Sequence, residues 1–269
     1  MSYKLVAIDM DGTLLNNQHQ VSIENKKTIK QLAKQGIGFV LASGRPYDAL
    51  HPYTQELEVY LPLITANGSV IKSTIDNKVY HKWQMPLKLA QKIYHYGLRN
   101  NFAVSLYFED EIVTFDEELA QGHRELEKIE PKVMEVEEFE FTKAPIKILY
   151  YNNSDEITKA FSKLTKQYAD KLYITRSDDE FLEFLNADVS KGMALEYLIE
   201  RLDLTAEEVI AIGNNHNDIA MFEVAGLAVA MDNAPQEVKE EADFITKSNL
   251  DNGVAYALKK FILNDKGEI

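Results

Sequence analysis

Short apolar runs alternate with helical patterns along the first third of the chain. Leu5–Ile8, Phe39–Ala42 and Leu63–Ala66 are continuous apolar runs of strand length, typical of strands that are buried on both faces. Between the first two runs, a helix is expected to begin after Ser22, a suitable N-cap, and to end at Gly36. Strand, helix and strand in this order predict βαβ units and a parallel sheet.

The pattern changes between about residues 84 and 186, where strand-like stretches of alternating character dominate. Helices are expected at Leu87–Leu98 and Glu156–Tyr168. The acidic stretch Glu135–Glu140 contains apolar residues, which favours a half-exposed strand or a connector over a binding feature. Strands are expected at Ala103–Phe108, Ile112–Phe115, Ile146–Tyr151, Leu172–Thr175 and Phe181–Leu185.

After Lys191 the βαβ pattern returns, with a helix over Gly192–Leu202 and an apolar run at Val209–Ile212. The remaining expected elements are a helix at Ile219–Ala225, a strand at Leu227–Met231, a helix after Pro235, a strand at Phe244–Ile245 and a helix at Gly253–Leu263. The simplest architecture is an α/β fold, in which both ends of the chain form a Rossmann-like parallel-sheet core. We expect core segments at residues 1–84 and 187–269, and an inserted α+β domain at residues 85–186.

Three of the apolar core strands are followed by unusual polar residues. In open parallel α/β sheets, ligands bind just beyond the carboxyl ends of the strands, so side chains at these positions are expected to converge. A lysine at the start of the helix after the inserted region joins the same set. The candidates are Asp9 and Asp11, Ser43 and Arg45, Asn214, Asn217 and Asp218, and Lys191.

Asp9 and Asp11 lie two residues apart at a strand end, so both side chains can face one pocket. Two close carboxylates repel each other unless a cation or hydrogen bonds compensate. Mg²⁺ is the natural partner, because it is a hard ion held by one or two carboxylates together with substrate oxygens. Asp11 followed by Gly12 is also common turn chemistry, so this pair alone does not separate a metal site from a turn.

The other polar residues fit a bound phosphate, although each also has an ordinary structural explanation. Ser43 and Gly44 offer a hydroxyl and backbone N–H groups to a phosphate oxygen. Lys191 can bind phosphate or pair with the aspartates. Arg45 either clamps a substrate anion or braces its loop, and bracing is slightly favoured. The pair Asn217-Asp218 also suits N-capping of a helix.

Composition narrows the partners and the chemistry. The 269 residues include 43 acidic and 29 basic ones, which gives a formal charge of −14. Such a surface repels nucleic acids and anionic membranes, and an anionic small substrate needs a local positive site. The chain has no cysteine, which excludes disulfides and thiolate chemistry. The first residues are too few and too acidic for a signal peptide, so we expect a cytoplasmic protein.

Four segments occur in an order that resembles the four motifs of the haloacid dehalogenase (HAD) superfamily of phosphatases. They are Asp9-Met10-Asp11-Gly12-Thr13-Leu14, Leu41-Ala42-Ser43-Gly44-Arg45, Ser190-Lys191-Gly192 and Gly213-Asn214-Asn215-His216-Asn217-Asp218. The insertion between the second and third segments resembles the C2B cap of the Cof-type sugar-phosphatase branch. Residues 228–234 and 251–254 resemble tail segments of that branch.

The resemblance implies a Mg²⁺-dependent phosphatase of small phosphorylated metabolites, such as sugar phosphates or similar monoesters. By position, Asp9 is the nucleophile that forms an aspartyl-phosphate, and Asp11 protonates the leaving alcohol and then activates water. The Asp11 carbonyl and the Asp9 carboxylate hold the metal. The resemblance assigns the phosphoryl oxygens to the backbone of Met10, to Ser43 and Gly44, to Lys191 and to the Asn217 amide.

One position departs from the pattern of this branch. Its fourth motif usually has an aspartate that ligates Mg²⁺ where this chain has Asn214. An amide oxygen still ligates a hard cation, but one negative charge is missing. Asp218, four residues later, is a candidate to restore that charge, directly or through water. The expected metal ligands are therefore Asp9, Asp11, Asn214 and Asp218.

Two alternatives to the phosphatase remain at this point. A phosphate- or metabolite-binding protein with weakened catalysis is motivated by Asn214. A phosphomutase with the same aspartyl chemistry fits less well, because it must retain a phosphoenzyme and handle bisphosphates. The inserted domain is expected to close over the site and to carry specificity, with Glu183 and Tyr47 as candidates that are more often structural.

Overall fold

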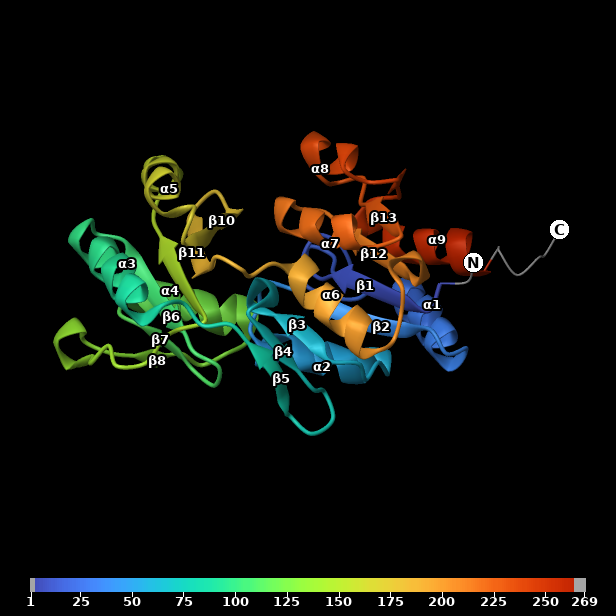
Figure 1. Cartoon of the computed structure of the whole chain (residues 1–269), viewed down its shortest axis with the longest axis horizontal. Coiled ribbons are helices and arrows are strands. Elements are labelled where there is room, and N and C mark those ends of the chain that lie inside the picture. The colour runs from blue at the N-terminus through green and yellow to red at the C-terminus, as the bar shows by residue number, and fades with distance from the viewer. Residues whose placement is uncertain (1–2, 264–269) are drawn as a thin grey trace. The chain divides into compact units, whose positions relative to one another are not determined.

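A computed structural model describes residues 3–263 of the chain (Figure 1). The chain forms two compact units. The first contains the chain up to Ser43, Leu50–Tyr80 and the chain from Ser190 onward, and the second contains Gly44–Ala49 and His81–Val189. The core of the fold is thus made from both ends of the sequence, as the hydrophobic pattern predicted.

The first unit is built on an eight-stranded sheet in the order β14-β13-β12-β1-β2-β3-β4-β5. Neighbours from β14 through β3 run parallel, and β4 pairs antiparallel with β3. The central strands are buried along their whole length, which explains why they appear in the sequence as continuous apolar runs. The strands are β1 (Leu5–Asp9), β2 (Gly38–Ala42), β3 (Leu63–Thr65), β4 (Val70–Lys72), β5 (Val79–Lys82), β12 (Val209–Gly213), β13 (Leu227–Ala230) and β14 (Phe244–Ile245).

Amphipathic helices accompany the strands of this sheet. In α1 the Ser22 side chain accepts a hydrogen bond from Asn25 N at 3.1 Å, which confirms the expected N-cap, and Ile29 and Leu32 are buried. The helices are α1 (Ile23–Lys34), α2 (Tyr47–Leu57), α6 (Lys191–Arg201), α7 (Ile219–Val224), α8 (Gln236–Glu240) and α9 (Gly253–Leu258).

Strand β1 lies in the middle of the sheet, between β2 and β12. Ile8 is opposite Leu41 of β2 on one side and Ile212 of β12 on the other, so the three strands end at the same level. Chain segments from the two ends of the sequence therefore leave the sheet side by side. Ligand sites of open α/β sheets form at such a point.

The second unit contains a six-stranded sheet in the order β10-β11-β9-β6-β7-β8. All pairs are antiparallel except β7 with β8. Helices α3 (Leu87–Arg99) and α5 (Ser154–Tyr168) share one hydrophobic core with one face of this sheet (Figure 1). The strands are β6 (Ala103–Tyr107), β7 (Ile112–Thr114), β8 (Lys132–Val133), β9 (Lys147–Tyr151), β10 (Leu172–Asp178) and β11 (Phe181–Asn186), and a short helix α4 (Glu117–Gly122) leads into a π-turn at His123–Glu127.

The stretch Glu135–Glu140 was expected to be a half-exposed strand or a connector. The structure shows the second of these, a connector with a 3₁₀ turn at Val136–Glu138. The expected domain limits at 84/85 and 186/187 stay a prediction, whereas the compact units change at 80/81 and 189/190. Within residues 3–263, none of the helices combines the length and the apolar character that a membrane crossing requires.

Candidate active site

A buried ion-pair network joins the two ends of the chain at the carboxyl edge of the main sheet. Lys191 Nζ lies 2.6 Å from Asp9 Oδ1 and 2.7 Å from Asp218 Oδ1. These three residues are 1%, 5% and 0% exposed, respectively. Asp9 is the last residue of β1, and Lys191 is the first residue of α6, where the Ser190 side chain caps the helix by accepting from Met193 N at 3.0 Å.

Burial and charge shift the acidities of this network. Burial, reinforced by the charge of Asp218, raises the pKa of Asp9 to about 7, although Lys191 opposes this shift. Burial by itself lowers the pKa of Lys191, but the two carboxylates outweigh it and raise the pKa above its usual range. Lys191 is therefore a fixed positive charge, whereas the charge of Asp9 responds to any additional cation.

Asp218 is fully occupied by this network and by its own loop. Its Oδ1 accepts from Lys191, and its Oδ2 accepts from the backbone N–H groups of Asn214 at 2.8 Å and Asn215 at 3.0 Å. The Asn215 side chain caps the following 3₁₀ turn in return. These contacts order the loop after β12. The expected N-capping of a helix by Asn217-Asp218 is not what the structure shows, because Asp218 makes no side-chain capping hydrogen bond to α7 and Asn215 is the capping residue of the preceding turn. The role of Asp218 as a metal ligand stays a prediction.

Asn214 faces both aspartates of the first motif. Its side-chain oxygen accepts a hydrogen bond from Thr13 Oγ1 at 2.9 Å and lies 2.9 Å from the Asp11 carbonyl oxygen and 3.1 Å from Asp9 Oδ2. With the amide turned by 180°, its NH₂ group instead donates to these same three oxygens. In the first orientation, the Asn214 oxygen lies among other oxygen atoms. In the second, the NH₂ group donates hydrogen bonds to those oxygen atoms.

The oxygen-facing orientation fits a magnesium ion. Asp9 Oδ2, the Asp11 carbonyl and Asn214 Oδ1 are hard oxygen donors. With bonds of about 2.1 Å, adjacent oxygens of an octahedral Mg²⁺ site are about 3 Å apart, close to the separations seen here. Among residues 3–263, no group of three His, Asp or Glu side chains is arranged to hold a metal ion. A metal at this position would therefore depend on one carboxylate, one amide and one backbone carbonyl.

Two glycines allow the backbone to approach closely around this site. Gly12 has φ +76°, and a Cβ atom there would lie 2.5 Å from the Asn214 side chain. Gly68 has φ +102°, and a Cβ atom there would lie 2.2 Å from the Ser190 carbonyl oxygen. Both positions therefore require glycine for its left-handed conformation and for the missing side chain. The second brings the turn after β3 against the start of the Lys191 helix.

Asn67 and Thr13 are polar residues of this region that the sequence analysis did not single out. Asn67 is buried, its N–H donates to the Ser43 carbonyl at 3.0 Å, and its Oδ1 accepts from Asn217 Nδ2 at 2.9 Å. Asn67 follows β3, which lies beside β2 in the sheet. A polar residue at the end of this strand could have indicated a further site residue in the sequence. Thr13 lies inside the first motif, and its contact with Asn214 spans 201 positions of the sequence.

The predicted site residues divide between the two compact units. Asp9, Asp11, Met10, Ser43, Lys191, Asn214, Asn217 and Asp218 lie in the first unit. Gly44 and Arg45 are grouped with the second unit, where the Arg45 guanidinium donates to the Leu126 carbonyl at 2.9 Å. This hydrogen bond to the backbone is consistent with the alternative in which Arg45 braces its own loop. Met10 is buried, and its carbonyl accepts from Leu15 N at 2.9 Å, which closes the turn after β1.

The model of one protein family, described as haloacid dehalogenase-like hydrolase, matches residues 6–258. The chain belongs to this family. HAD relatives include the Bacillus subtilis proteins named 5-amino-6-(5-phospho-D-ribitylamino)uracil phosphatase YwtE, which is 31% identical over 96% of this chain and 98% of its own length, and phosphatase YwpJ, which is 30% identical over 96% and 100%. The crystal structure of a haloacid dehalogenase-like hydrolase from Bacteroides thetaiotaomicron has a TM-score of 0.86 and 32% identity over 96% of this chain and 99% of that one.

The similarity covers almost the whole of each HAD relative, so it includes both the parallel-sheet core and the inserted domain. The protein is accordingly a hydrolase of phosphate monoesters with a Rossmann-like HAD core and an inserted α+β cap, and it is of the Cof type. HAD phosphatases generally use Mg²⁺, which agrees with the oxygen donors around Asp9.

Proposed function

We propose that this protein is a Mg²⁺-dependent phosphatase of small phosphorylated metabolites that works through an aspartyl-phosphate on Asp9. The observation that carries the proposal is the environment of the Asp9 carboxylate. One of its oxygens is bound by the buried ammonium of Lys191, and the other belongs to the oxygen cluster with Asn214 and Asp11. Lys191 fixes the first oxygen, and the Asn214 amide NH₂ or a bound cation fixes the second, so the carboxylate is oriented for attack at one point.

The proposed first step is an in-line displacement at phosphorus. An Asp9 oxygen forms the new O–P bond while the bond from phosphorus to the leaving oxygen breaks. Asp11 donates a proton to the leaving oxygen, so the alcohol departs neutral. In the second step Asp11 takes a proton from water, the water oxygen attacks phosphorus, and the Asp9 carboxylate is released with inorganic phosphate.

The placement of Asp11 supports its role in both proton transfers. Its side chain is 43% exposed and lies 3.4 Å from His19 Nδ1, so it can exchange protons with solvent. Asp9, in contrast, is buried and is suited to attack at phosphorus and not to exchange with bulk water. Two carboxylates in different environments take different roles by the same logic in other hydrolases.

Mg²⁺ would be held by the Asp9 carboxylate, the Asp11 carbonyl and Asn214, with Asp218 as a further candidate. When bound, it supplies positive charge that compensates both the aspartates and the phosphoryl group. Lys191 contributes a second, permanent positive charge to the phosphoryl oxygens. The remaining donors proposed for these oxygens are the backbone of Met10, Ser43, Gly44 and the Asn217 amide, with Arg45 bracing the adjacent loop.

The substrates proposed are sugar phosphates and similar monoesters. Two Bacillus subtilis relatives at 31% identity are named as phosphatases of 5-amino-6-(5-phospho-D-ribitylamino)uracil, a phosphorylated polyol attached to a pyrimidine. This compound therefore belongs in a substrate panel with hexose, pentose and polyol phosphates. We favour this class because its members share a small polar leaving alcohol with a single phosphate.

The test is the release of inorganic phosphate from such a panel and from an aryl phosphate, with and without excess Mg²⁺. We expect Mg²⁺-dependent release by the wild-type protein and none above background by Asp9→Asn. Full activity in Asp9→Asn would refute the nucleophile assignment. Transfer of the phosphoryl group to a second position of the sugar, without free phosphate, would instead indicate a phosphomutase.

A further inference from the structure

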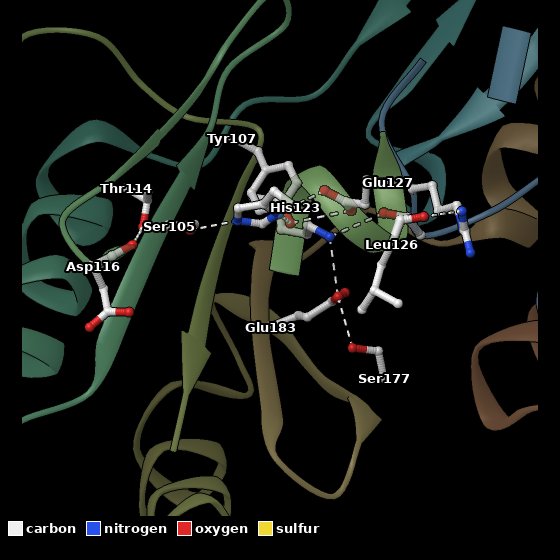
Figure 2. Close-up of polar contacts among 12 residues, drawn as sticks. Ser105, Tyr107, Thr114, Asp116, His123, Leu126, Glu127, Ser177 and Glu183 are labelled. Carbon is white, nitrogen blue, oxygen red and sulfur yellow. Dashed lines mark hydrogen bonds and ion pairs between the residues drawn. The ribbon is translucent and has the colours of Figure 1, made fainter. Parts of the chain in front are cut away.

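The second compact unit contains a buried polar cluster that the proposed reaction does not use. It lies on the sheet face opposite the hydrophobic core of α3 and α5, because its strand residues alternate with the core residues of the same strands. Figure 2 draws this cluster and its polar contacts. Its members are Ser105 and Tyr107 on β6, Lys147 on β9, Ser177 on β10, Glu183 on β11, and His123 and Glu127 on the π-turn.

Lys147 is the centre of this cluster. Its Nζ lies 3.1 Å from Glu183 Oε1 and 4.1 Å from the centroid of the Tyr107 ring, and Ser177 Oγ donates to the same Glu183 oxygen at 3.0 Å. Lys147 and Glu183 are only 2% and 3% exposed. Since removing two charges from water is costly, a buried pair of this kind is weak evidence for stability and calls for another explanation.

The neighbouring part of the cluster fixes the π-turn to the sheet. His123 Nδ1 is 2.8 Å from Glu127 Oε2, and His123 Nε2 is 2.8 Å from Ser105 Oγ. This arrangement resembles a serine–histidine–acid triad, but Ser105 is completely buried and therefore cannot act as a nucleophile on a substrate. Burial, together with the charges of Glu127 and Glu183, raises the pKa of Tyr107 well above its usual value, so its hydroxyl remains a donor toward Glu127.

Both halves of the cluster hold the segment Gly44–Ala49. Lys147 Nζ donates to the Gly44 carbonyl at 3.1 Å. Arg45 Nη1 donates to the carbonyl of Leu126. Leu126 lies near the end of the π-turn, where backbone carbonyls have no partner within the turn. These two contacts tie the segment to the second compact unit, although it is only six residues long and follows Ser43 directly in the chain.

We propose that Lys147 and Glu183 are positioning residues, whose buried ion pair fixes the Gly44 carbonyl and thereby the backbone that follows Ser43. The inference rests on the proposed function, in which Ser43 and Gly44 bind the phosphoryl group. Glu183 orients the ammonium of Lys147, and Lys147 holds the carbonyl. The pair is retained for the geometry of this segment, because a pair of apolar residues would fill the same space without the cost of burying charge.

The test removes the ion pair without leaving a lone buried charge. The double variant Lys147→Met/Glu183→Met keeps side chains of similar length and loses the hydrogen bond to Gly44. Its matched control is Lys159→Met/Glu156→Met, which removes an exposed lysine–glutamate pair of the same unit, with an N–O distance of 2.7 Å. Hydrogen exchange of residues 44–49 is measured in both variants, together with kcat and KM for an aryl phosphate.

We expect exchange in residues 44–49 to become at least tenfold faster in the Lys147/Glu183 variant, while the helices α3 and α5 keep their protection. We also expect kcat to fall at least fivefold with KM within twofold, because a displaced phosphate loop acts on the transition state more than on substrate binding. If the ion pair only stabilised the fold, its removal would lower the unfolding temperature without lowering kcat relative to KM. The control variant should match the wild type in every measurement.

Unchanged exchange in residues 44–49 of a folded Lys147/Glu183 variant would overturn the inference. Should that variant not fold, Glu183→Gln replaces it, since it keeps the shape and one acceptor oxygen. The same acceleration is expected there, and its absence has the same meaning. A wild-type protein without phosphatase activity would refute the proposed function separately, and the exchange measurement would still decide whether Lys147 anchors the segment.

Discussion

Replacing Asn214 with aspartate should strengthen metal binding at the site. The side-chain amide atom of Asn214 that faces the first motif lies 3.1 Å from Asp9 Oδ2 and 2.9 Å from the Asp11 carbonyl oxygen. In Asn214→Asp, a second carboxylate therefore faces Asp9 at hydrogen-bond distance. The amide alternative, in which the NH₂ group donates to Asp9, is lost at the same time.

The magnitude follows from this separation. Two unit charges about 3.1 Å apart at an effective dielectric constant near 20 repel each other by about 5 kcal/mol. Part of this repulsion is avoided in the metal-free variant, because Asp9 already has a pKa of about 7 and takes up a proton readily. A divalent cation between the carboxylates relieves what remains. We expect a gain in Mg²⁺ affinity of at least tenfold, or about 1.4 kcal/mol.

Two measurements check this expectation. The first is the Mg²⁺ concentration that half-activates hydrolysis of an aryl phosphate, and the second is the unfolding temperature with and without Mg²⁺, which does not depend on activity. Asn214→Asp should lower the half-activating concentration and should be less stable than the wild type without metal but gain more from its addition. Asn215→Asp is the matched control, since it adds the same charge one residue away at a capping position.

An unchanged activation concentration together with an unchanged metal-free unfolding temperature would refute the reasoning, because it would mean that residue 214 does not face Asp9. A loss of stability without a gain in metal affinity would refute the metal assignment alone. The repulsion would then be present, but no cation would relieve it.

Three further substitutions test other parts of the site. Asp9→Asn should abolish turnover and, in the metal-free protein, should stabilise the fold increasingly as pH rises from about 4 to above 7. The pKa of Asp9 is raised in the folded state, so the wild type loses stability across that range, as urea unfolding at several pH values would reveal. Lys191→Met should destabilise the protein by about 3–5 kcal/mol, measured by urea unfolding, because it leaves buried carboxylates without their cation. Gly68→Ala should cost more stability than Gly36→Ala, measured by thermal unfolding, since both glycines have positive φ but only residue 68 meets the Ser190 carbonyl, and equal losses would contradict the close approach.

The sequence predicted the parts of this fold that depend on burial pattern. Strands β1, β2 and β12 were visible because strands buried on both faces need an unbroken apolar run. The convergence of Asp9 and Lys191 was also predictable, because the helix that leads into a parallel strand begins at the edge of the sheet where the other strands end, and α6 leads into β12. Their separation of 2.6 Å, across 182 positions of the sequence, is the spatial consequence of that rule.

Other features were not predictable because the same residues serve ordinary local structure. Asn67 after β3 resembles a turn residue, and its contacts with Ser43 and Asn217 depend on how three loops meet. Asp218 fits both a metal ligand and a helix cap, and only the coordinates show that both of its oxygens already accept hydrogen bonds. Likewise, no pattern in the sequence indicates that Gly44–Ala49 packs with a different unit from Ser43.

The most direct test of the proposed chemistry is to look for the covalent intermediate itself. Wild-type protein is mixed with Mg²⁺ and an aryl phosphate, quenched in acid within the first turnover, digested and analysed by mass spectrometry. We expect one phosphoryl group on the peptide that contains Asp9, and none in Asp9→Asn. Phosphate release at the normal rate with no phosphoryl group on that peptide, or with one on a different residue, would contradict the central claim.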